Sequence, residues 1–143
     1  METKIVIYGE PVPQGRPRFA RMGKFVHAYD QAKSKNYKQL VRFWATQQLK
    51  KVDGFKPFEN ALYVEITFHL PIPASWSKKK RMDASQGVIR PARKPDLDNL
   101  YKSVTDALNG LLWVDDNIIT DAHIKKRYTA DVARTEIVVK EVQ

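Results

Sequence analysis

Acidic residues gather around one predicted helix in a chain that is otherwise strongly basic. Asp96 and Asp98 stand two apart where an extended segment turns into the helix, so their oxygens can be aimed at one point. Lys102 follows Asp98 by four residues and shares the polar helix face, and Asp115-Asp116 comes later in a predicted tight turn. Carboxylate oxygens are the ligands that Mg²⁺ and Mn²⁺ prefer. A basic chain attracts nucleic acid and an acidic cluster needs a compensating cation, so the pattern predicts a metal-dependent nuclease.

The helix that positions these residues is predicted over about 98–109. Pro95 biases the residue before it towards an extended backbone, and Asp96 or Asp98 is suited to cap the helix start. Asn109-Gly110 is a suitable stop, because both residue types tolerate a left-handed backbone. The chain must then reverse direction for the acidic turn to approach the helix start. The apolar residues recur at three- and four-residue steps, as one buried stripe: Leu97, Leu100, Val104, Ala107, Leu108 and Leu111.

Each of these charged residues also has a plain structural interpretation. Asp96 and Asp98 are common capping residues, and Asp115-Asp116 taken alone suits a solvated turn. Lys102 taken alone suits a surface ion pair with an acidic residue one helical turn away. The conjunction of all these parts in a basic chain favours the nuclease.

The complete pattern resembles the RusA-type Holliday junction resolvases. Their signature is a D-x-D-N helix start with a lysine four residues after the second Asp, then D-A-L, an aromatic-containing stretch and D-D. It corresponds here to residues 96–102, 106–108 and 113–116. The resemblance implies that Asp96, Asp98 and Asp116 bind the metal, with Asp115 as a weaker candidate ligand, and that Lys102 is a catalytic helper. It also implies a four-way DNA junction as substrate and a homodimer that makes paired nicks.

The charge of the chain supports a polyanionic partner such as branched DNA. The 143 residues carry a net charge of +9, with a pI of about 9.8. Residues 16–25 are predicted to form a basic loop with interleaved aromatics that contacts DNA, and this loop is similar to an element of the same family. Residues 71–95 are predicted to form a mobile basic arm that grips the DNA backbone. The alternative for each segment is a solvated loop without a role in DNA binding. Trp76 suits either base stacking or the core. The candidate DNA-binding residues are Arg16, Arg18, Arg21, Lys24, Lys78, Lys79, Lys80, Arg81, Arg93 and Lys94.

Several other classes of site are disfavoured. The chain has no cysteine, which excludes disulfides and thiolate metal sites, and His27, His69 and His123 show no zinc spacing. No signal peptide and no apolar run of 18 residues is visible. We therefore expect no membrane partner and a cytoplasmic protein, associated with the nucleoid of a bacterium or of a phage-infected cell.

The chain is predicted to be a single α+β domain over residues 1–143. Strands are predicted at 3–9, 61–70, 118–128 and 135–142, the last two joined as a hairpin, and a further helix at 31–50. The order strand-helix-strand-helix-strand-strand indicates helices packed on a mixed or mostly antiparallel sheet.

Phosphodiester hydrolysis builds negative charge, which carboxylates stabilise only through a bound cation such as Mg²⁺, or Mn²⁺ in its place. Lys102 carries a compact positive charge suited to the leaving oxygen. Two other functions remain open from the residues. One is a metal-dependent nuclease that acts on flaps or damaged duplexes, and the other is a non-catalytic basic DNA-binding protein.

Overall fold

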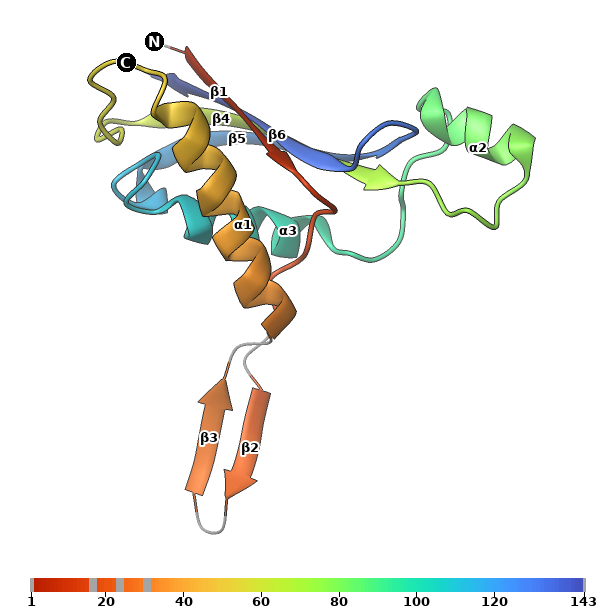
Figure 1. Ribbon diagram of the computed structural model, residues 1–143, viewed down its shortest axis with the longest axis horizontal. Helices are drawn as coiled ribbons and strands as arrows, with labels where there is room; N and C mark the ends of the chain where they lie inside the picture. Colours follow the sequence, from red (N-terminus) through yellow and green to blue (C-terminus); the bar gives the residue numbers. More distant parts are fainter. Residues whose placement is uncertain (1, 16–17, 23–24, 30–31, 143) are drawn as a thin grey trace.

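The computed structural model describes residues 2–15, 18–22, 25–29 and 32–142. Its main element is a four-stranded mixed sheet in the order β1-β6-β4-β5 (Figure 1). β6 is antiparallel to both β1 and β4, whereas β5 runs parallel to β4. The bounds of these strands are β1 Glu2–Tyr8, β4 Leu62–Pro71, β5 Ile119–Thr129 and β6 Arg134–Glu141.

β4 is an inner strand of the sheet, as its sequence predicts. From Leu62 to Leu70 its side chains alternate strictly between buried and partly exposed. The apolar set points to the covered face, and the intervening set, which includes Glu65 and His69, lies on the opposite and more polar face. Such alternation is typical of a strand with one face on the core.

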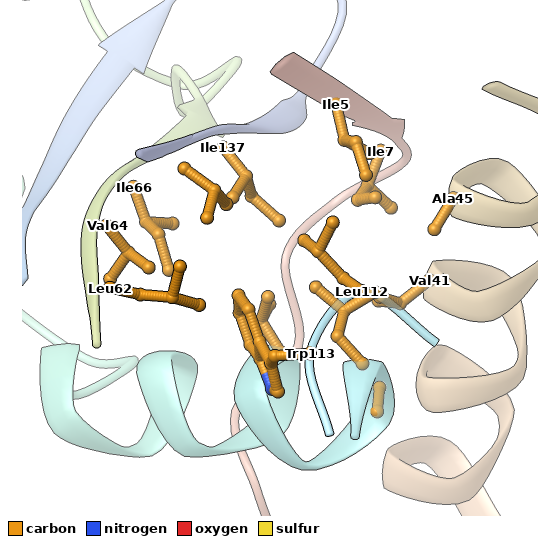
Figure 2. Close-up of a cluster of buried hydrophobic side chains, with 14 of the residues drawn as sticks. Ile5, Ile7, Val41, Ala45, Leu62, Val64, Ile66, Leu112, Trp113 and Ile137 are labelled. Carbon is orange, nitrogen blue, oxygen red and sulfur yellow. The ribbon is translucent and has the colours of Figure 1, made fainter. Parts of the chain in front are cut away.

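Two helices cover the apolar face of the sheet. α1 (Ala32–Leu49) packs along β1, and α3 (Leu97–Leu108) packs against α1 and β5. Trp113 is fully buried between α3 and the sheet (Figure 2). The α3 stripe is confirmed, because Leu100, Val104, Ala107 and Leu108 are all buried. The α+β class and the approximate order of the elements are confirmed as well.

The predicted hairpin between the last two strands is wrong. β5 and β6 do not pair, because β4 lies between them. Four residues, 130–133, connect the two strands across the end of β4. A short polar connection shows only that the chain turns, whereas burial decides which strands are neighbours. β4 carries the most regular buried row and so takes the interior position.

The N-terminal basic segment contains two strands where the sequence predicts a loop. β2 (Arg18–Met22) and β3 (Phe25–Tyr29) form an antiparallel ladder from Arg18–Tyr29 to Met22–Phe25. Phe19 in β2 and Phe25, Val26 and Tyr29 in β3 are aromatic or β-branched residues that favour this pairing. Figure 1 shows the hairpin projecting beyond the N-terminal end of α1. Arg16 and Lys24 lie outside the described residues.

The basic segment after β4 contains a short helix that the sequence does not predict. α2 (Lys78–Ser85) begins at Ser77, whose hydroxyl accepts a hydrogen bond from the Lys80 N–H at 3.2 Å. Its Ala84 is buried in a second small core with Leu70 and Tyr128. Trp76 packs edge-on against Tyr128 with ring centroids 5.3 Å apart, so it anchors this lobe. Within the described part of the chain, no helix is long and apolar enough to cross a membrane.

Candidate active site at the start of helix α3

Asp96 occupies the N-cap position of α3, but its carboxylate is not used as a cap. The residue is exposed and has an extended backbone with φ of −71° and ψ of 139°. The Leu100 N–H bonds to the Asp96 backbone carbonyl at 3.1 Å, while the side chain makes no capping hydrogen bond. A capping aspartate normally gives its carboxylate to an orphan N–H of the first turn. The capping interpretation of this side chain is therefore not supported.

Asp98 and Lys102 lie one helical turn apart on the exposed side of α3. Four residues correspond to about 6 Å along a helix axis. Among the described residues, neither side chain is in an ion pair. Asp106, the next acidic residue on this side, is held by Lys38 of α1 at 3.8 Å. Among the described residues, Asp98 and Lys102 are thus charged side chains without an ion-pair partner in the first half of the helix.

The chain reverses direction after α3, as the sequence requires. Gly110 has a positive φ of 78°, a left-handed conformation that glycine adopts without strain. Its N–H bonds to the Trp113 carbonyl at 2.7 Å, and the Trp113 indole N–H donates to the Asn109 side-chain oxygen at 2.9 Å. The buried Trp113 therefore fixes the turn that brings residues 115–116 back alongside α3.

The two residues of the acidic pair have different surroundings. Asp115 precedes the 3₁₀ turn η1 (Asp116–Ile118), and its carboxylate accepts a hydrogen bond from the Asn117 N–H at 3.4 Å. Asp116 lines an open hollow of about 350 Å³ beside α3. Its other lining residues are Tyr101, Lys102, Thr105 and Asp106. The structure thus brings Asp116 next to Lys102 and gives Asp115 a structural role in the turn.

Tyr101 belongs to this hollow and is a residue that the sequence does not single out. Partial burial raises the pKa of its hydroxyl, and the negative charge of Asp116 raises it further. The phenol therefore stays protonated near neutral pH and can donate a hydrogen bond. Its place in the sequence, directly before Lys102, was the available signal.

Asp96 borders a different concavity, on the other side of the helix start. This open groove of about 710 Å³ lies between the helix and the N-terminal loop. The Gln14 backbone N–H bonds to the Asn99 carbonyl at 2.9 Å and joins the loop to the first turn of α3. Charged residues of its lining, besides Asp96, are Glu10, Lys33 and Lys94. Sequence reasoning missed Glu10 and Lys33, which are distant along the chain and belong to no motif.

The oxygen donors suit a hard divalent cation, but the described residues do not form a ready chelating set. Asp96, Asp98 and Asp116 offer carboxylates, the chemistry that Mg²⁺ and Mn²⁺ prefer. Within residues 2–15, 18–22, 25–29 and 32–142, no three carboxylate or imidazole groups converge closely enough to hold one ion. A metal at this site requires these side chains to turn towards one another.

Cations lie on the chain leading to the acidic site. Lys78, Lys79, Lys80 and Arg81 are exposed on α2, and Arg93 and Lys94 are exposed just before Asp96. Two of the α2 residues also make local contacts. Lys80 sits 4.0 Å from the centre of the Trp76 ring, and Arg81 donates to the Pro73 carbonyl at 3.3 Å. Arg18 and Arg21 belong to β2, and their side chains lie outside the description.

Comparison with known families decides what kind of protein has this arrangement. The family model described as endodeoxyribonuclease RusA matches residues 8–140. The chain belongs to the RusA family. The three short motifs predict a RusA-family resemblance, and the match extends it from the end of β1 through α1 to nearly the end of β6. The family is described by its endodeoxyribonuclease activity.

A curated relative of this RusA-family protein is similar along almost its full length. It is the uncharacterized protein YqaN of Bacillus subtilis (strain 168), 40% identical over 139 residues. The alignment covers 97% of this chain and 96% of that protein. The two proteins therefore have nearly the same extent, and neither has a long segment outside the alignment.

Proposed function

We propose that this RusA-family protein is a Mg²⁺-dependent, structure-selective endodeoxyribonuclease that resolves four-way DNA junctions. The observation that supports this most is the set of carboxylates on Asp96, Asp98 and Asp116, which are not used for capping or ion pairing among the described residues. Carboxylates left without such partners contribute little to folding, whereas they are what a metal-dependent reaction needs.

Asp96, Asp98 and Asp116 are the proposed ligands of the ion. When bound, Mg²⁺ (or Mn²⁺) supplies Lewis-acid stabilisation of the charge on the phosphate and lowers the pKa of its bound water. Asp96 and Asp98 are exposed and Asp116 is half-buried, and binding one ion requires the three side chains to turn towards one another. Without a cation their mutual repulsion favours the spread arrangement.

Lys102 and Tyr101 are the proposed partners of the phosphate. The Lys102 ammonium is a compact charge in the same hollow as Asp116, suited to the leaving 3′ oxygen. Tyr101, held in the protonated form by burial and by Asp116, donates a hydrogen bond in the same place. These positions accommodate a negatively charged group next to the acidic site.

The exposed cations on α2 and at residues 93–94 are the proposed backbone contacts. They lie on the segment that returns from the α2 lobe to Asp96 (Figure 1). Contacts of this kind position DNA without reading its sequence, and each neutralised phosphate steepens the salt dependence of binding by roughly 0.9 in log–log slope. A homodimer with two-fold symmetry would match the pseudo-symmetry of a junction and make nicks in opposite strands.

The test uses an immobile four-way junction, a flap and a linear duplex, each labelled in one strand at a time. Wild-type protein with Mg²⁺ should cut the junction at paired positions and leave ligatable 5′-phosphate ends, and EDTA should abolish the cut. The Asp98→Asn variant should bind the junction but not cut it, whereas Asp53→Asn, which removes an exposed carboxylate elsewhere, should cut normally.

Three outcomes would contradict the proposal. Preferential cutting of the flap would make the protein a nuclease with another substrate. Salt-sensitive binding without any metal-dependent product would make it a DNA-binding protein. Wild-type cleavage by the Asp98→Asn variant would remove the acidic site from the reaction.

A further inference from the structure

Lys126 of β5 is a half-buried basic residue whose ammonium is hydrogen-bonded to the protein's own backbone. It lies opposite Phe68 in the parallel ladder, in the row of β5 side chains that faces the core together with Ile124 and Tyr128. Its ammonium donates to the carbonyl of Arg93 at 2.8 Å and to the carbonyl of Pro95 at 2.9 Å. A partly buried lysine needs such acceptors, because an unpaired charge away from water is costly.

The two acceptors identify what Lys126 holds. Arg93 and Pro95 flank Lys94, and Pro95 immediately precedes Asp96. Both carbonyls belong to the segment that enters α3. On the other side of that entry, the Gln14 N–H holds the Asn99 carbonyl at 2.9 Å. The first turn of α3 is therefore tied to the sheet by Lys126 and to the N-terminal loop by Gln14.

We propose that Lys126 is a positioning residue that holds the backbone from which the Asp96 and Asp98 side chains project. Asp96 makes no capping hydrogen bond of its own, so its backbone is directed by what holds the preceding residues. The charge-assisted bonds of Lys126 are stronger than neutral ones and fix two points only two residues apart. This inference rests on the proposed function, because it assigns Lys126 to the same acidic site.

The opposite expectation is that Lys126 is one more phosphate contact among 25 lysines and arginines. The geometry disfavours this, since two of the three N–H donors of the ammonium already point to carbonyls. Lys125 provides a matched comparison. It is the preceding residue of β5, equally charged, and lies opposite Thr67 on the other face of the sheet.

The experiment compares Lys126→Met, Lys126→Arg and Lys125→Met with the wild type. The readouts are the Mg²⁺ concentration for half-maximal junction cleavage, junction affinity in EDTA, Mn²⁺ binding to the protein alone, and amide exchange of the first turn of α3. For Lys126→Met we expect a loss of roughly tenfold or more in metal affinity, as for other residues that orient ligands. We also expect faster exchange confined to residues 97–100. Lys126→Arg, which keeps charged donors, should recover most of this loss.

Junction affinity in EDTA should fall equally in Lys126→Met and Lys125→Met, because each removes one charge. A larger fall in Lys126→Met, with unchanged metal binding, would make Lys126 a phosphate contact and overturn the proposal. Unchanged exchange and metal binding would overturn it too. If Lys126→Met does not fold, Lys126→Gln is measured in its place under the same criteria. Failure of the nuclease proposal is distinguishable: the wild type would then not cleave, while the exchange difference would persist.

Discussion

Asp115 and Asp116 are adjacent in the chain, but their carboxylates have different partners. The Asp115 carboxylate accepts a hydrogen bond from the Asn117 N–H, whereas Asp116 borders the hollow beside α3 with Tyr101. The short 3₁₀ turn that begins at Asp116 separates their directions. A residue that is bonded within the turn and a residue of the candidate site are therefore adjacent in the chain.

This difference predicts opposite effects of the same substitution. Asp116→Asn should reduce junction cleavage by roughly 10²-fold or more, the usual size for loss of one electrostatic contact at a reacting group. Asp115→Asn should cleave within a few-fold of the wild type, because asparagine caps such turns as well as aspartate does. Single-turnover cleavage of a labelled junction measures both. Equal losses in the two variants would mean that the pair acts as one unit.

Gln48 protects the exposed edge of β1. Its side-chain amide accepts from the Val6 N–H at 2.9 Å and donates to the Val6 carbonyl at 2.7 Å. Gln48→Ala should leave both backbone groups without these partners and lower the free energy of unfolding by about 1–3 kcal/mol. Urea unfolding measures this. Gln47→Ala, on the exposed side of the same helix, is the control and should change stability little.

Trp113 supports both the core and the chain reversal. It is fully buried, and its indole N–H bonds to Asn109. Trp113→Ala should cost about 3–5 kcal/mol, as large-to-small changes in a core do. Phe43→Ala, which removes an aromatic ring that is 52% exposed, should cost much less. Thermal unfolding of the two variants compares them, and similar melting temperatures would contradict the placement of Trp113.

Tyr37 makes stability fall at alkaline pH. Burial raises the pKa of its hydroxyl from 10.0 to about 12, although the hydrogen bond with Thr135 at 3.1 Å lowers it slightly. Above pH 10 the unfolded chain releases this proton while the folded chain keeps it. The stabilisation is therefore complete below pH 10 and is lost towards pH 12, by up to about 1.4 kcal/mol per pH unit.

Urea unfolding between pH 8 and 11.5 tests the role of Tyr37. The Tyr37→Phe variant should lose less stability over this range than the wild type, and Tyr8→Phe, at an exposed position, should follow the wild type. Parallel curves for all three proteins would show that the buried tyrosine is not responsible.

Much of the fold follows from periodicity in the sequence. The stripe from Leu100 to Leu108 predicts α3 to within one residue of its observed bounds, and the alternation in β4 predicts its buried face. These signals are local. A helical stripe depends on residues three or four positions apart, and strand alternation depends on residues two positions apart. The neighbour of β5 is not a local property, so the sequence predicts a hairpin where β4 intervenes.

The candidate site divides in the same way. The spacing of Asp96, Asp98 and Lys102 predicts that all three lie at the start or in the first half of one helix. The structure confirms these places in α3. Their use as metal ligands stays a prediction. The carbonyl contacts of Lys126 could not be foreseen, because one lysine in a basic chain looks like any other.

The strand order has a consequence for how the sheet assembles. β6 is the hydrogen-bonding partner of both β1 and β4, although it is distant from both along the chain. β1 and β4 are joined only through β6, so the sheet closes through non-local pairings, which form slowly because long loops must be ordered first. The layer that supports α3 and the candidate site therefore depends on contacts that no local segment of the chain can make.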